Sequence, residues 1–214
     1  MNQASEPFLH VEPEDIERTS LSIIRAELKE AGIRLDPENE SVIVRAIHTT
    51  ADFDYAKTLV FSEGAVAKAR EALRSGAHIV TDTNMALAGV NRRVLASFGG
   101  EAHCFMADPD VAAEAKARGV TRATVSMERG TALGVPVIFA VGNAPTALIS
   151  LCEAIQKGFR PELVIGVPVG FVNVVPAKEQ ILRTDVPYIV NRGRKGGSTV
   201  AAAICNALLY MLGR

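Results

Sequence analysis

Short apolar runs alternate with stretches of helical periodicity over the last two thirds of the chain. The runs lack the polar alternation of a half-exposed strand, which is typical of strands buried on both faces of a parallel sheet. Strand–helix alternation favours a parallel sheet with helices on both faces. The predicted strands are 77–81, 102–106, 135–141, 163–167 and 187–190, and the predicted helices between and after them are 85–98, 110–118, 145–157, 172–183 and 198–212.

The first quarter of the chain is predicted to be helical. Pro13-Glu14-Asp15 forms an acidic helix start with a stop at Gly32, and Asp36-Pro37-Glu38 opens a second helix towards His48. We therefore expect an α/β fold with three layers (α/β/α), a flavodoxin-like, five-stranded, mainly parallel sheet and N-terminal helices. Residues 1–214 are expected to form a single domain, with 1–11 as a flexible tail.

Composition narrows the function classes. The chain has 214 residues, of which 48% are hydrophobic, and 23 basic against 24 acidic residues give a net charge of −1. A general nucleic-acid binder would be basic, so no nucleic-acid partner is expected. The uncharged stretch 130–152 is broken by glycines and prolines, so no membrane span is expected either. Three cysteines without metal-ligand spacing and an acidic N-terminus without an apolar core indicate a cytoplasmic protein.

Ligands of such sheets bind beyond the carboxyl ends of the strands, which directs attention to the segments that follow the predicted strands. The segment 191–198 brings Arg192, Arg194 and Lys195 together with two glycines and opens the last helix at Ser198. Free N–H groups and cations at a helix start favour an anion. A solvated basic loop with a serine cap is the alternative, and the Walker A order is absent. Thr83 and Asn84, after the first predicted strand, either bind a ligand or cap a helix.

The second helix carries Arg45 and His48, three residues apart on one stripe of an otherwise apolar helix. The pair is interpreted either as an anion-binding arginine beside an acid/base histidine or as a structural pair satisfied at the edge of the core. His78 and His103 are interpreted as core or sheet-end residues. The sequence contains no nucleophile elbow, metal-ligand spacing or cofactor fingerprint, so we expect proton transfer and anion binding, with no metal and no cofactor.

Several segments follow one another in a characteristic order. They are Val44-Arg-Ala-Ile-His48, Asp52-Phe-Asp54, Gly76-Ala-His-Ile-Val-Thr-Asp-Thr-Asn-Met85, Gly142-Asn-Ala-Pro145, Gly166-Val-Pro-Val-Gly-Phe-Val172 and Arg192-Gly-Arg-Lys-Gly-Gly-Ser198. In this order they resemble the precorrin-8X methylmutase family, from about residue 12 to the C-terminus. Each motif is weak alone, whereas the ordered set is highly specific.

The resemblance implies an isomerase of corrin ring synthesis on the route to cobalamin. Such enzymes move a methyl group from C11 to C12 and give hydrogenobyrinate, or cobyrinate when cobalt is already inserted. The resemblance further implies a homodimer that binds a polycarboxylate tetrapyrrole. It places the active-site histidine at His48 and substrate contacts at Arg45 and Ser22. Thr49-Thr50-Ala51-Asp52 follows the histidine where the family often has small residues and methionine, which changes the expected wall of the pocket.

Three alternative functions are therefore considered for the chain. The first is the methylmutase, with His48 as general acid and with Ser22, Arg45, Thr83, Asn84, Arg192, Arg194, Lys195 and Ser198 as substrate-binding residues. The second is a non-catalytic tetrapyrrole carrier that uses the same residues for binding alone. The third is a nucleotide- or phosphate-binding α/β module built on the 192–198 loop.

Overall fold

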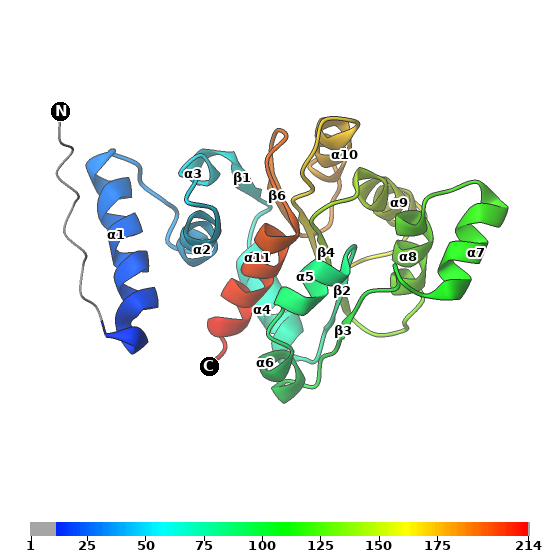
Figure 1. Ribbon diagram of the computed structural model, residues 1–214, viewed down its shortest axis with the longest axis horizontal. Helices are drawn as coiled ribbons and strands as arrows, with labels where there is room; N and C mark the ends of the chain where they lie inside the picture. Colours follow the sequence, from blue (N-terminus) through cyan, green and yellow to red (C-terminus); the bar gives the residue numbers. More distant parts are fainter. Residues whose placement is uncertain (1–11, 214) are drawn as a thin grey trace, which may run out of the picture.

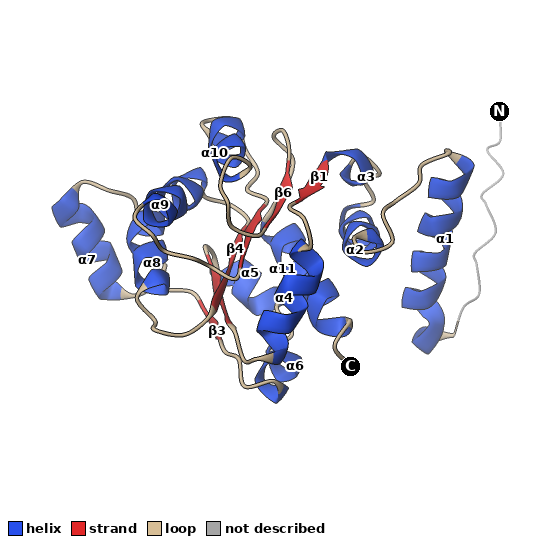
Figure 2. Cartoon of the chain, turned by 180° about the vertical axis from the view of Figure 1, so that it is seen from behind, coloured by secondary structure: helices blue, strands red, loops and turns tan. Residues whose placement is uncertain are grey.

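The computed structural model describes residues 12–213, so the expected tail lies outside the described residues. Within this range the strands form one sheet in the order β1-β6-β5-β4-β2-β3, flanked by helices (Figures 1 and 2). All neighbouring strands are parallel except β1, which pairs antiparallel with β6. The strands are β1 (Leu59–Phe61), β2 (His78–Thr81), β3 (Ala102–His103), β4 (Val137–Val141), β5 (Leu163–Gly166) and β6 (Tyr188–Asn191).

The parallel part of the sheet runs in the order β3-β2-β4-β5-β6, which is the flavodoxin-like order 2-1-3-4-5. The predicted fold class is therefore confirmed. The switch point of the topology lies between β2 and β4, whose register pairs Val80 with Phe139. The sixth strand, β1, escaped prediction because it has only three residues and directly follows a short helix.

Helices surround the sheet, and those over residues 55–58, 65–74 and 122–131 were not predicted. They are a 3₁₀ turn (Pro13–Asp15), α1 (Ile16–Glu30), α2 (Glu40–Thr50), α3 (Tyr55–Thr58), α4 (Ala65–Arg74), α5 (Asn84–Gly89), α6 (Arg92–Ser97), α7 (Pro109–Arg118), α8 (Arg122–Thr131), α9 (Pro145–Gln156), α10 (Val174–Ile181) and α11 (Ser198–Tyr210). The predicted helix 85–98 is in fact two helices. Asn91 caps α6 at the break, and Asn206 bonds the backbone of both Asn91 and Gly89 across it.

Two hydrophobic cores pack on the two faces of the sheet. Helices α1, α2, α4 and α11 contribute to one core, and α8, α9 and α10 to the other. Helix α11 is apolar around most of its circumference because the chain's own core encloses it, with Val200, Ile204 and Leu208 at most 1% exposed. Its apolarity therefore gives no sign of a subunit interface. Across residues 12–213, no helix combines the length and hydropathy that a bilayer crossing requires.

Candidate active site

His48 lies in the last turn of α2 and is half-buried against α1. Its Nδ1 is 2.8 Å from the hydroxyl oxygen of Ser20 on α1. Ser20 lies four residues before Ile24 and eight before Leu28, the two buried residues of α1, so all three share the face that packs inward. This hydrogen bond fixes the plane of the imidazole ring and occupies one of its two nitrogens.

Ser20 was not predicted from the sequence. The four-residue spacing of Ile24 and Leu28, continued towards the N-terminus, places Ser20 on the inward face of α1. The predicted residue, Ser22, lies two positions further and therefore on a different side of the helix. It is exposed, and its hydroxyl donates to the carbonyl of Arg18 at 2.9 Å. Among the described residues, no hydrogen bond joins Ser22 to the histidine. The substrate-binding role of Ser22 stays a prediction.

Arg45 lies one turn before His48, and its charge is balanced within the chain. Its Nη2 is 2.5 Å from Oε1 of Glu17 on α1, and the guanidinium lies 5.3 Å from the ring centre of Tyr210 on α11. The side chain is 15% exposed. A cavity of about 170 Å³ adjoins it, lined by Leu21, Arg25, Ser41, Val44, Arg45, Ala207, Tyr210 and Met211. A carboxylate that binds Arg45 must therefore share the guanidinium with Glu17.

Asp82 braces the two loops at the switch point of the sheet. The carboxylate is fully buried and accepts N–H bonds from Gly142 (2.8 Å), Asn143 (2.8 Å) and Ala144 (2.6 Å). Burial raises the pKa of Asp82, while the three N–H bonds oppose that rise. The brace ties the loop after β2 to the loop after β4, where the fold class places its ligand.

Thr83 and Ser198 meet beside this brace, with their hydroxyl oxygens 2.8 Å apart. Thr83 also caps α5 by accepting the N–H of Ala86 at 3.0 Å. Gly142 permits the approach of the α11 start, since a Cβ at this position would lie 2.6 Å from the Cα of Ser198. The structure thus joins two predicted residues from distant segments, while the neighbouring Asn84 is exposed at the start of α5.

A buried lysine holds the basic loop, which we define as residues 192–197. Lys178 of α10 is fully buried, and its Nζ donates to the carbonyls of Gly193 and Lys195 at 2.8 Å each. Asn191 adds a further bond to the carbonyl of Lys195 at 2.8 Å. Burial lowers the pKa of Lys178 to about 8. This residue is not predicted from the sequence, because a lysine in a helix is ordinarily exposed.

The three cations of the basic loop have different partners. The Nζ of Lys195 is 2.5 Å from Asp52 and 2.7 Å from Asp54, so it ties the loop to the turn that follows the helix of His48. This pairing lowers the pKa of Asp52. Arg192 lies 3.6 Å from Glu179. Arg194 instead lies over the ring of Phe171, 5.4 Å from its centre, and no carboxylate among residues 12–213 forms an ion pair with it.

Large apolar side chains are exposed around these polar groups. Phe171 is 82% exposed, Val172 77% and Met85 67%. Phe171 and Val172 lie in the segment after β5, and Met85 lies in the segment after β2. All three residues are therefore beyond the carboxyl ends of strands. The candidate site therefore combines cations, hydroxyl groups and exposed apolar side chains with one histidine.

Comparison with known proteins identifies the family. The sequence model of the family "Precorrin-8X methylmutase" matches residues 15–211. The chain belongs to the precorrin-8X methylmutase family. Members of this family are isomerases of cobalamin biosynthesis, so the resemblance and the predicted enzyme class are confirmed. The alternative function, a non-catalytic tetrapyrrole carrier, is not favoured.

Relatives and a solved structure from the same family agree over nearly the whole length. The chain is 44% identical over 207 residues to the cobalt-precorrin-8 methylmutase of Salmonella typhimurium, covering 94% of this chain and 96% of the relative. It is 41% identical over 196 residues to the precorrin-8X methylmutase of Pseudomonas aeruginosa, with 90% and 93% covered. A solved precorrin-8X methylmutase from Thermus thermophilus superposes with a TM-score of 0.83 at 41% identity, covering 92% of this chain and 97% of that one.

Proposed function

We propose that the chain moves a methyl group from C11 to C12 of precorrin-8X or cobalt-precorrin-8, with His48 as general acid. The products are hydrogenobyrinate and cobyrinate, respectively. The observation that carries the proposal is the Ser20–His48 hydrogen bond at the end of α2, next to a turn that Lys195 ties to the basic loop. An oriented histidine beside a cationic loop suits protonation of a polycarboxylate.

The proposed chemistry needs few groups. Methyl migration breaks one carbon–carbon bond and forms another within the same molecule, so no nucleophile or leaving-group acceptor is required. A proton placed on the conjugated ring makes it electron-poor and favours migration to the adjacent carbon. Because substrate and product are isomers, the ring gives this proton back to the histidine once the methyl group has moved. Because Ser20 engages Nδ1, we assign proton delivery to Nε2 of His48. The rest of the site has to hold one conformer of the ring.

Substrate binding is assigned to two kinds of surface. The peripheral carboxylates would bind Arg45, Arg192 and Arg194, and they would bind Lys195 only by sharing it with Asp52 and Asp54. Ser22, Thr83, Asn84 and Ser198 would supply hydrogen bonds. The exposed side chains of Met85, Phe171 and Val172 suit the flat, largely apolar faces of the macrocycle.

We further propose a cytoplasmic homodimer, an assignment for which the family resemblance is the main support. The cavity beside Arg45, at about 170 Å³, is smaller than the roughly 300–1,000 Å³ of ordinary ligand pockets, and a tetrapyrrole needs more. A second subunit over the exposed Phe171 and Val172 would cover the substrate on the side of the basic loop, where Phe171 lies with Arg194. Light scattering at micromolar concentration tests this, and a monomer mass would refute it.

Incubation of the purified chain with metal-free and cobalt-containing substrate tests the function. Conversion changes the absorption spectrum of the ring, and kcat/KM for the two substrates identifies the natural one. Tight binding of both without any spectral conversion would instead favour the carrier. Thermal stabilisation by nucleotides, with no effect of either tetrapyrrole, would favour the phosphate-binding module.

A further inference from the structure

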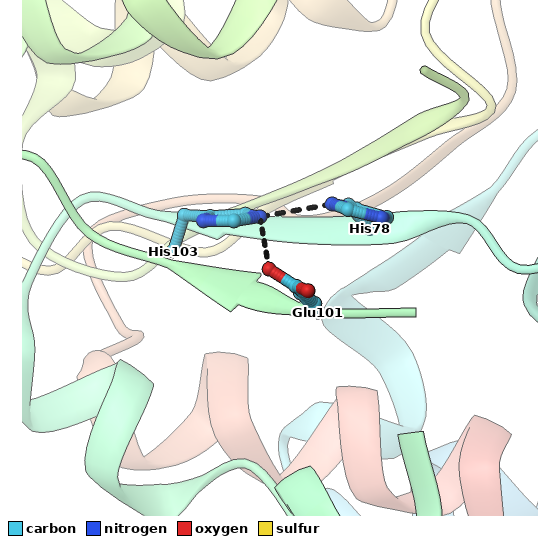
Figure 3. A group of neighbouring side chains, drawn as sticks. All are labelled: His78, Glu101 and His103. Carbon is cyan, nitrogen blue, oxygen red and sulfur yellow. Dashed lines mark hydrogen bonds and ion pairs between the residues drawn. The ribbon is translucent and has the colours of Figure 1, made fainter. Parts of the chain in front are cut away.

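Two histidines and a glutamate converge where β3 runs along the edge of the sheet. The Nδ1 of His78 on β2 is 2.9 Å from the Nε2 of His103 on β3, and Oε2 of Glu101 is 3.9 Å from the same Nε2 (Figure 3). These three ligand atoms all lie within 4.8 Å of one another. We propose that this group, called the edge triad below, binds a divalent transition-metal ion of the Zn²⁺ class.

The strand register explains why the three side chains meet. Ile79 pairs with Ala102, and Val80 pairs with His103 in parallel register. Since side chains alternate along a strand, His78 and His103 project from the same face of the sheet, and Glu101 shares that face. The rigid backbones of two neighbouring strands therefore bring the ligands together, and only side-chain rotation is left to complete a site.

The distances are close to those that a bound metal requires. Ligand atoms about 2.0–2.1 Å from a tetrahedral Zn²⁺ are roughly 3.3 Å from one another. The two imidazole nitrogens, at 2.9 Å, would separate slightly, and the carboxylate oxygen, which is 3.9 Å from His103 and within 4.8 Å of His78, would move closer to both. Glu101 can move, because its side chain is 72% exposed, while that of His103 is 22% exposed and is stacked on Phe105.

The ligand atoms of the edge triad, two imidazole nitrogens and one carboxylate oxygen, determine which class of cation it can bind. Two imidazoles and one carboxylate suit Zn²⁺ and its first-row neighbours, whereas Mg²⁺ and Ca²⁺ prefer oxygen ligands alone. Three protein ligands leave a fourth position for water on the exposed side. The edge triad shares no residue with the candidate active site. His78 begins β2, whereas Thr83 follows the carboxyl end of that strand. The backbone of His103 lies nearer to that end, because the hydroxyl of Thr81 donates to the carbonyls of both His103 (3.2 Å) and Thr83 (3.0 Å).

Stabilisation of the sheet edge is the expected consequence. Strand β3 has only two residues, and its pairing within the described sheet is with β2 alone. A cation held by one side chain of β2 and two from the β3 segment would cross-link them in the folded state. Because the unfolded chain lacks this arrangement, binding should raise the melting temperature.

Titration calorimetry with ZnCl₂ tests the proposal. The full chain is first dialysed against a chelator and then against buffer. We expect one equivalent to bind and to raise the melting temperature by several degrees, with MgCl₂ inactive. His103→Gln and the exposed Glu101→Gln should each weaken Zn²⁺ binding more than tenfold. The melting temperature without metal shows that each variant is folded, and Glu101→Gln keeps the test decisive if His103→Gln does not fold.

Cys104→Ser is the matched control, because Cys104 is a metal-binding residue type next to His103 that does not belong to the edge triad. His48→Asn is the second control, at the candidate active site. Both should bind Zn²⁺ like the wild type. The proposal is overturned if the wild type binds no Zn²⁺ at stoichiometric concentrations, if Glu101→Gln and His103→Gln bind it unchanged, or if either control loses it.

Discussion

The helix pair that carries His48 and the basic loop both belong to the candidate site, yet they are positioned by different means. His48 and Arg45 stand on a regular helix, and their partners Ser20 and Glu17 come from the helix packed against it. The basic loop has no regular structure of its own, and the ammonium group of Lys178 underneath holds its carbonyls. The histidine is therefore oriented by helix packing, whereas the loop is held by two buried side chains, Asn191 and above all Lys178, which bonds two of its carbonyls.

Removal of the Lys178 side chain should have the largest effect on stability. Lys178→Met keeps a similar volume but leaves the carbonyl of Gly193 without its donor, while the carbonyl of Lys195 keeps the bond from Asn191. One unsatisfied acceptor costs roughly 1–3 kcal/mol, so we expect a loss of that size in the free energy of unfolding, measured by urea titration, and a raised KM. Lys157→Met, at an exposed lysine, is the matched control and should unfold like the wild type.

The same variant should change the pH dependence of stability. The pKa of Lys178 is about 8 in the folded chain, below the ordinary lysine value of about 10.4. Between these values the unfolded chain binds more protons, so this group makes stability rise with pH. The stability advantage of the wild type over Lys178→Met should therefore grow from pH 8 to pH 10, and an advantage that shrinks would contradict the lowered pKa of Lys178.

The two serines of α1 separate the positioning of His48 from other roles of this helix. Ser20→Ala removes a hydrogen bond worth about 1 kcal/mol and should lower kcat roughly fivefold, with KM little changed. Ser22→Ala is the matched control and should leave kcat unchanged. If Ser22 binds substrate as the resemblance implies, its loss raises KM instead. Equal kcat values for Ser20→Ala and the wild type would show that the contact does not orient the histidine.

Within the basic loop, Arg194 should contribute more to binding than Lys195. Arg194 has no carboxylate partner among residues 12–213, whereas Asp52 and Asp54 already neutralise Lys195. Arg194→Gln should raise KM about three- to tenfold at low salt and less at high salt, because exposed charges are screened. Lys195→Gln should raise KM less than twofold. The reverse order would mean that substrate displaces the two aspartates.

The sequence predicts the parallel strands, most of the helices and the position of the basic loop, because these follow from local patterns of apolar residues and from turn glycines, whereas α3, α4 and α8 were not predicted. It also predicts Arg45 and His48 as neighbours, since three-residue spacing defines a helix face. It does not predict Lys178 as a buried residue or the pairing of His78 with His103. Both features depend on segments that are distant in sequence and meet only in the folded chain. Strand β1 and the break between α5 and α6 were also not predicted, because neither has a strong pattern of apolar residues.

Substrate binding and single-turnover conversion by His48→Asn test the central claim most directly. Asparagine keeps a polar side chain at this position but cannot deliver a proton at neutral pH. We predict that the variant binds substrate within a few fold of the wild type while its conversion rate falls by roughly 10²–10⁴. A variant that folds, binds substrate and retains more than about a tenth of the wild-type rate would contradict the role of His48 as general acid.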